Sequence, residues 1–204
     1  MCAAFAVPTF AFATQAQIGQ AGADAAPACP KTPCLVVSRT TGYQAKVGTT
    51  RGLMTVPQDG RIVAWKISLG KPGTKQIAFF DSKLGGEATA QITIIRPGGK
   101  LRSRVMAQGE PQKLSPYFGT TVEFPLQQTI AVKKGWIVAL TVPTWAPALA
   151  DGLGSDTSWR AARGKGACED TQAQTAQTQP QQLAQYYCLY KARLTYSATL
   201  VSTP

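Results

Sequence analysis

The chain consists largely of short runs of residues that favour β-strands, and turn residues separate these runs. Turns containing Gly or Pro, such as QDG, KPG, LGG, PGG and KKG, stand between the runs. Strands that are short and regularly spaced are typical of a sandwich or barrel. We therefore predict a single all-β domain, an antiparallel, jelly-roll-like β-sandwich of about 8–11 short strands. The runs are 34–39, 52–57, 61–69, 75–81, 88–96, 101–108, 121–126, 129–132 and 136–143.

Two segments show the alternation of a half-buried strand. In 61–69 the apolar residues Val63, Trp65, Ile67 and Leu69 are two apart. In 190–200 apolar residues alternate with polar ones along the whole segment. This period places one strand face on a core and the other in water. We expect 190–200 to be one long closing strand.

Charge and composition restrict the class of partner. The chain has 204 residues, of which 15% are charged, and a formal net charge of +11. A basic surface favours anionic partners such as phosphate-bearing envelope polymers, acidic polysaccharide or anionic lipid headgroups. The alternative is that the charge only keeps the protein soluble. The sequence has no apolar run of about 20 residues, so we expect no transmembrane segment.

The N-terminal residues resemble the end of an export signal. An apolar run from Cys2 to Ala13 ends in Ala11-Phe12-Ala13, which fits an A-x-A cleavage site, although a basic segment before it is missing. Ala23-Asp24-Ala25 is a second candidate. We interpret residues 1–28 as a signal-peptide remnant and flexible tether, and 29–204 as the sandwich. The alternative is a buried N-terminal strand. Export predicts a secreted or cell-surface protein.

Four cysteines remain once the signal is removed. Their spacing favours the disulfides Cys29–Cys34 and Cys168–Cys188, although three connectivities are possible. The second would close a polar, Gln-rich segment, about residues 169–185, which we expect to be a disordered or loop insert because it has little apolar surface to bury. A zinc site is the alternative, but the cysteines are not in close pairs and the chain has no histidine.

Three longer segments suggest a family. VPQDGRIVAWKISL, FPLQQTIAVKKGWIVALTVPTWAPAL and the final ARLTYSATL resemble segments of uncharacterised exported bacterial β-sandwich proteins of jelly-roll type. The resemblance spans about residues 29–204 and implies a sandwich fold and export. It implies no activity and no functional residue.

The residues argue against most enzyme classes. Without histidine there is no Ser-His-Asp or Cys-His nucleophile, and the sequence has no phosphate-binding or dinucleotide motif. We therefore expect no cofactor, no metal and no catalytic residue. A pair among the carboxylates Asp81, Glu87, Glu110 and Glu123 could still act on sugars. Asp151 to Asp156, DGLGSD, could bind calcium, but is better explained as a Gly-rich turn.

Two tryptophans stand near basic or turn residues. Trp145 lies among prolines and is expected on a loop, and Trp159 precedes Arg160, Arg163 and Lys165. An aromatic ring beside cations can stack on a sugar while the cations meet phosphate or carboxylate. The alternative for Trp145 is a core position that closes one end of the sandwich.

A second basic run is RPGGKLRSR. Pro97-Gly98-Gly99 indicates a hairpin tip, and the candidate ligand-binding cations around it are Arg96, Lys100, Arg102 and Arg104. Arg102 and Arg104 are two apart, so they share one strand face. The alternative is a solvated hairpin without a partner.

These observations favour an exported, non-catalytic module that binds carbohydrate or an anionic cell-envelope polymer. A structural or assembly protein of the cell surface is the first alternative, and a carboxylate-dependent carbohydrate-active enzyme is the second. No nucleic-acid motif is present, so we expect no specific nucleic-acid partner. The oligomeric state is left open, as is whether the two basic segments meet in space.

Overall fold

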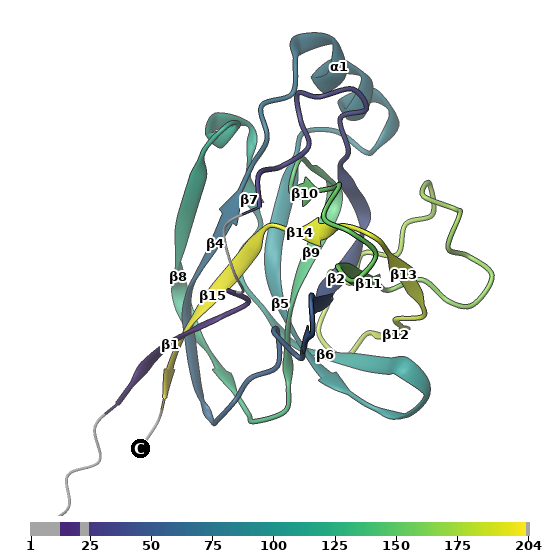
Figure 1. The fold of residues 1–204 in the computed structure, drawn as a ribbon. Coiled ribbons are helices and arrows are strands. Elements are labelled where there is room, and N and C mark those ends of the chain that lie inside the picture. The colour runs from purple at the N-terminus through teal and green to yellow at the C-terminus, as the bar shows by residue number, and fades with distance from the viewer. Residues whose placement is uncertain (1–12, 21–24, 203–204) are drawn as a thin grey trace, which may run out of the picture.

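The computed structural model describes residues 13–20 and 25–202, which form two main antiparallel sheets (Figure 1). The first sheet has four strands. Its order is β1 (Gln15–Ile18), β15 (Tyr196–Ser202), β4 (Gly60–Ser68) and β8 (Thr121–Val132). Within the described residues, β8 pairs only with β4, so it is an edge strand, and it contains Pro125.

The second sheet has nine strands. Its order is β12 (Leu183–Gln185), β6 (Arg102–Gln108), β5 (Thr89–Pro97), β9 (Ile137–Ala146), β2 (Val37–Val47), β11 (Ser158–Ala161) and β13 (Cys188–Tyr190), with β3 (Thr50–Arg51) beside β2 and β7 (Gln112–Lys113) beside β5. Only Tyr186 and Tyr187 separate the two terminal strands β12 and β13 in sequence. The sheet therefore curls until its ends approach each other. Strands β10 (Leu149–Ala150) and β14 (Arg193–Leu194) form a separate pair.

The main core lies between the two sheets. Trp65 of β4 is fully buried and its ring centroid is 4.9 Å from that of Phe124. The Tyr196 hydroxyl of one sheet donates to the Val138 carbonyl of the other, at 3.0 Å. A Cβ at Gly109 would lie 2.8 Å from Leu126 Cδ2 of β8. The sheets pack face to face around apolar side chains, which confirms the predicted all-β, sandwich-like fold.

The other face of the nine-stranded sheet carries buried hydroxyl groups. Thr41 of β2, Thr93 of β5 and Thr141 of β9 are fully buried. The Thr141 hydroxyl is 2.8 Å from that of Thr41 and 2.7 Å from that of Thr93. Buried polar groups of this kind need partners, because an unpaired one costs about 1–3 kcal/mol.

The Gln-rich segment supplies those partners. The Gln177 N–H donates to the Thr41 hydroxyl at 2.8 Å, and the Gln177 carbonyl accepts from Gln108 Nε2 at 2.7 Å. The buried Tyr186 hydroxyl donates to Gln177 Oε1. Residues 169–185, expected to be a disordered or loop insert, form an ordered loop that ends in β12. Polar contacts order this segment, so its small apolar surface does not indicate disorder.

One predicted strand is a helix. Residues 75–81 lie within α1 (Thr74–Lys83), where Gln76 Oε1 accepts from the Gly73 N–H at 2.8 Å. Phe80 and Leu84 are buried, and Ile77 is half-buried against the core. This spacing of three and four residues is helical, and it decides the local structure. The other helical segments are the single turns η1 (Gly99–Leu101) and η2 (Ser115–Tyr117).

Other strand boundaries also differ from the prediction. The 52–57 run makes only one isolated bridge, between Thr55 and Ile137. The runs 121–126 and 129–132 are a single strand, β8. Val63 was expected on the buried face of its strand, together with Trp65. The pairing of β4 with β8 shifts register between Ile62 and Ala64, and these two residues are buried while Val63 is half-buried. Within the described residues the fold has fifteen strands, of which six are only two or three residues long.

Both ends of the chain differ from the sequence interpretation. Residues 190–200 are divided among β13, β14 and β15, so they do not form one strand. Gln15–Ile18, which we expected within a tether, pair with β15 as β1, and Ile18 and Ala28 are buried. The first proposed cleavage site and Cys2 lie largely or wholly outside the described residues.

Replacing Gln177 with Ala should lower the free energy of unfolding by about 2 kcal/mol, because the buried Tyr186 hydroxyl loses its acceptor. Chemical denaturation measures this loss. The matched control is Gln179→Ala, since Gln179 is exposed, and it should change the free energy by less than about 0.5 kcal/mol. On the Gln177→Ala background, Tyr186→Phe should cost less than in the parent protein. Fully additive losses would contradict the proposed contact.

The fold should also lose stability in alkali. Burial raises the pKa of Tyr186 and of Tyr196 well above the usual value of 10.0, and burial also raises that of Tyr43. Protonated tyrosine is favoured in the folded state, so this contribution is complete below pH 10 and is lost as the pH rises through the folded-state pKa values. A tyrosine that is ionised in the unfolded state but still protonated in the folded state should lower the free energy of unfolding by about 1.4 kcal/mol per pH unit, which sets the slope of stability against pH. Denaturation at a series of pH values measures it, and Tyr186→Phe should reduce the slope.

Candidate functional site

Four cations lie around the hairpin that joins β5 and β6. The strand register places Arg96 directly opposite Arg104, and Arg102 lies two residues before Arg104 on the same strand face. Burial alternates along β6, with Arg102 exposed, Ser103 buried and Arg104 half-buried. Arg102 and Arg104 therefore share the outer face, as predicted. We call Arg96, Lys100, Arg102 and Arg104 the cationic hairpin.

The cationic hairpin has unusual electrostatics. Like charges directly opposite each other on a sheet are destabilising. The two ion pairs found in the described part of the chain, Lys66–Glu123 and Lys113–Glu87, lie elsewhere, so no acidic side chain balances these arginines within that part. Arg104 donates to the Gln181 carbonyl at 3.1 Å, which holds the side chain but does not neutralise it. An anionic partner would relieve the repulsion.

The hairpin tip is strained. Lys100 and Leu101 have φ values of 56° and 60°, in the left-handed region that residues other than Gly, Asn and Asp rarely adopt. The Gly98 N–H closes the turn by donating to the Arg102 carbonyl at 2.7 Å, which confirms the predicted tip. Leu101 is 43% exposed. Residues held in such conformations concentrate at functional sites.

Strand β12 extends this surface with apolar groups. Leu183 lies opposite Arg104 and is 52% exposed, and Gln185 lies opposite Arg102. The Gln185 amide also donates to the Lys100 carbonyl at 3.2 Å. Leu101 and Leu183 were not predicted as site residues from the sequence. The cations flanking Leu101 could have indicated it, but nothing in the sequence indicates that Leu183 pairs with β6.

The two basic segments meet through the dipeptide Tyr186-Tyr187. The Tyr186 N–H donates to the Leu101 carbonyl at 2.8 Å, and the Tyr187 N–H donates to the Arg163 carbonyl at 3.1 Å. Arg160 Nη1 donates to both tyrosine carbonyls, at 3.2 and 3.1 Å. The two basic segments are therefore linked through this dipeptide, but the Arg160 side chain is engaged in hydrogen bonds within the fold. Lys165 is exposed in the loop after β11.

Arg163 is buried away from the cationic hairpin. Its side chain donates to the Tyr190 hydroxyl at 3.2 Å and to the Ser38 carbonyl at 3.1 Å. Its guanidinium carbon lies 5.8 Å from the Tyr190 ring centroid. It is 4% exposed, so the prediction from the sequence that it meets a polymer on the open surface is wrong.

Neither candidate tryptophan is an open stacking platform. Trp145 is fully buried at the end of β9, not on a loop, and its indole N–H donates to Asp81 at 2.9 Å and to the Gly86 carbonyl at 3.1 Å. Its ring lies 4.9 Å from that of Phe80. Trp159 is buried in β11 against Gly42, where an added Cβ would come within 2.7 Å of its ring. Strand pairing and helix packing, which local sequence does not reveal, place both rings inside.

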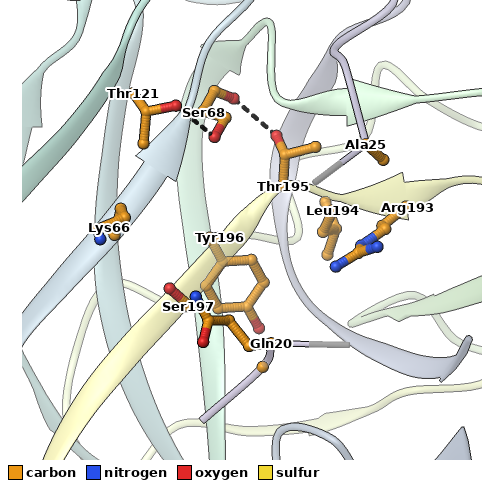
Figure 2. A pocket seen from close by; sticks show the side chains of 11 residues that line it. Gln20, Ala25, Lys66, Ser68, Thr121, Arg193, Leu194, Thr195, Tyr196 and Ser197 are labelled. Carbon is orange, nitrogen blue, oxygen red and sulfur yellow. Dashed lines mark hydrogen bonds between the residues drawn. The ribbon is translucent and has the colours of Figure 1, made fainter. Parts of the chain in front are cut away.

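A polar pocket of about 220 Å³ lies on the four-stranded sheet (Figure 2). Its hydroxyl groups bond within the fold: Ser68 and Thr121 are 2.8 Å apart, and the Thr195 hydroxyl donates to the Ser68 carbonyl at 2.7 Å. Lys66 is in an ion pair with Glu123 at 3.5 Å. The pocket is a weaker candidate, because these polar groups already have partners.

Three of the four carboxylates singled out in the sequence have structural side-chain contacts, whereas half-buried Glu110 contributes only its backbone carbonyl, which accepts from the Gln112 amide. Asp81 accepts from Trp145, Glu123 pairs with Lys66, and Glu87 pairs with Lys113 at 2.9 Å. The Lys113 ammonium lowers the pKa of Glu87. Among the described residues, no three His, Cys, Asp or Glu side chains gather as metal ligands would, and Asp151 to Asp156 form an exposed turn.

The disulfides Cys29–Cys34 and Cys168–Cys188 are both present, as predicted, which rules out the alternative zinc site. Disulfides indicate an oxidising environment outside the cytoplasm. In the described part of the chain, no helix combines the length and hydropathy needed to span a bilayer.

Comparisons with family models, with curated proteins and with solved structures gave no match to this chain. The resemblance to exported bacterial sandwich proteins therefore stays a prediction. The candidate function depends on the geometry of the chain alone.

Trp145→Phe should lower the free energy of unfolding by about 2 kcal/mol, because both indole hydrogen bonds are lost and the carboxylate of half-buried Asp81 loses its donor. Thermal and chemical denaturation measure the loss. Trp136→Phe, at a half-buried position, controls for the smaller ring. Unchanged stability combined with lost carbohydrate binding would contradict the structural role of Trp145.

Proposed function

We propose that this protein is an exported, non-catalytic module that binds an anionic cell-envelope polymer through the cationic hairpin. The observation that carries the proposal is the direct pairing of Arg96 with Arg104, on a face that also presents Arg102 and has no acidic partner in the described residues. Such an arrangement is costly in the free protein and becomes favourable when phosphate or carboxylate groups lie over it.

The chemistry of arginine supports a phosphate or carboxylate ligand. A guanidinium group forms paired hydrogen bonds with either anion, and a two-stranded hairpin holds three such groups on one rigid surface. A polymer that repeats its charges can contact several of them together. The burial of Trp145 and Trp159 removes support for recognition of a neutral sugar by stacking.

Export is part of the proposal. Two disulfides suit an oxidising compartment, where the cell-envelope polymer is also located. The net charge of +11 adds long-range attraction, which should raise the association rate and make binding sensitive to salt.

The triple variant Arg96→Gln/Arg102→Gln/Arg104→Gln should weaken binding to a teichoic-type phosphate polymer by about tenfold or more at low salt. This corresponds to the loss of three exposed contacts, each worth roughly 0.5 kcal/mol or more. Binding is measured by calorimetry at low and high salt, with an acidic polysaccharide, a neutral polysaccharide and anionic liposomes as comparisons. Parent binding to the polymers should fall steeply with salt.

The matched control removes three exposed lysines elsewhere, as Lys75→Gln/Lys133→Gln/Lys134→Gln. Both variants lower the net charge by the same amount, so an equal loss in the two would show that charge alone matters and would contradict a site at the hairpin. Salt-resistant binding to the neutral polysaccharide would contradict the anionic ligand. Binding only to liposomes would reassign the surface to lipid headgroups.

A further inference from the structure

A second cavity lies on the opposite side of the Tyr186-Tyr187 dipeptide from the hairpin, where β11 and β13 meet the residues that lead into β2. Its volume is about 340 Å³, within the range of small-molecule sites. Most of its lining is apolar, including Leu35, Val36, Leu149, Trp159 and Ala192. A cavity of this size and character suits the hydrophobic part of a small ligand.

One wall of the cavity contains a buried cation. Arg163 lines the cavity and is 4% exposed, and its guanidinium is held by the Tyr190 hydroxyl and the Ser38 carbonyl. Arg163 Nε is buried without a hydrogen-bond partner. Arg163 takes part in neither of the two ion pairs found among the described residues. Arginine is rarely buried without a pairing acid, because desolvation of the charge is expensive.

The polar groups near Arg163 favour an anion. Trp159 packs against Tyr190 with the rings tilted and their centroids 4.9 Å apart, and Trp159 Nε1 is also buried without a partner. Exposed Lys191 is a second cation in the lining, which contains no acidic residue. The cavity therefore combines apolar walls with two cations and no acid, and two of its lining side chains, those of Arg163 and Trp159, carry a buried N–H group without a partner.

We propose that this cavity binds a small organic anion with an apolar body, namely a hydrophobic monocarboxylate whose carboxylate group pairs with Arg163 and Lys191. The cavity volume limits the body to a medium-length chain or a single aromatic ring. The ligand would supply the negative charge that the fold does not place beside Arg163. This site is separate from the cationic hairpin and goes beyond the proposed function.

The test is calorimetric titration of the full chain with octanoate, with 3-phenylpropionate, and with 1-octanol as a neutral analogue of octanoate. At least one carboxylate should bind saturably with one-to-one stoichiometry, and octanoate, if it is an acid that binds, should do so at least about tenfold more tightly than octanol, because one charged hydrogen bond is worth about 1.4 kcal/mol or more. The acid that binds more tightly shows whether the cavity favours a linear chain or an aromatic ring. Saturable binding of octanol as tight as that of octanoate, or no saturable binding of either acid, would overturn the proposal.

Two variants test the residues. Arg163→Met removes the charge but keeps a long side chain, and it should weaken carboxylate binding about tenfold or more. Val36→Trp, at a half-buried lining position, should fill the cavity and abolish binding while Arg163 stays in place. The second variant keeps the test decisive if Arg163→Met does not fold.

Matched controls separate this site from the hairpin. Lys165→Gln removes an exposed cation near Arg163 in sequence that does not line the cavity, and it should bind the acid as the parent does. The triple hairpin variant should also keep acid binding while it loses polymer binding. Loss of acid binding in either control, or full binding in Val36→Trp, would contradict the assigned cavity.

Discussion

The polar face of the nine-stranded sheet imposes a requirement that shapes much of the molecule. Thr41, Thr93 and Thr141 place three hydroxyl groups where no water reaches them, and their mutual hydrogen bonds leave further bonding capacity unused. The Gln177 backbone satisfies part of that capacity, and its side chain accepts a hydrogen bond from the Tyr186 hydroxyl. The Gln177 backbone thus serves the threonines, and the Gln177 side chain adds bonds that an apolar residue could not make, to the Tyr186 hydroxyl and to the Gln182 carbonyl.

Both candidate sites depend on how that loop is anchored. The Cys168–Cys188 disulfide joins the start of the loop to β13, and β12 joins its end to β6. Between these anchors, Tyr186 and Tyr187 bond to the hairpin tip on one side and to Arg163 on the other. The ordered loop thus fixes the edge of the cationic hairpin and one wall of the apolar cavity.

Local patterns predicted the features that local chemistry controls. Cysteine spacing predicted both disulfides, and the period of two predicted that Arg102 and Arg104 share a face. Features that depend on distant packing were missed. Ile77, Phe80 and Leu84 have helical spacing, but the short run around them also fits a strand. For Trp145 the core position stated as an alternative is confirmed, but its hydrogen-bond partners, Asp81 and Gly86, are about sixty residues away in sequence and were not predicted. The burial of Arg163, which depends on Ser38, was not predicted either.

The edge strand β8 has a consequence for self-association. Long exposed edges invite a strand from another molecule, which leads to fibres or amorphous aggregates. Pro125 interrupts β8 with a residue that cannot donate a hydrogen bond to a new neighbour, and Glu123 adds a charge close by. The register shift in the paired strand β4 falls at the same level. These features make β8 a poor template for pairing with a strand of another molecule.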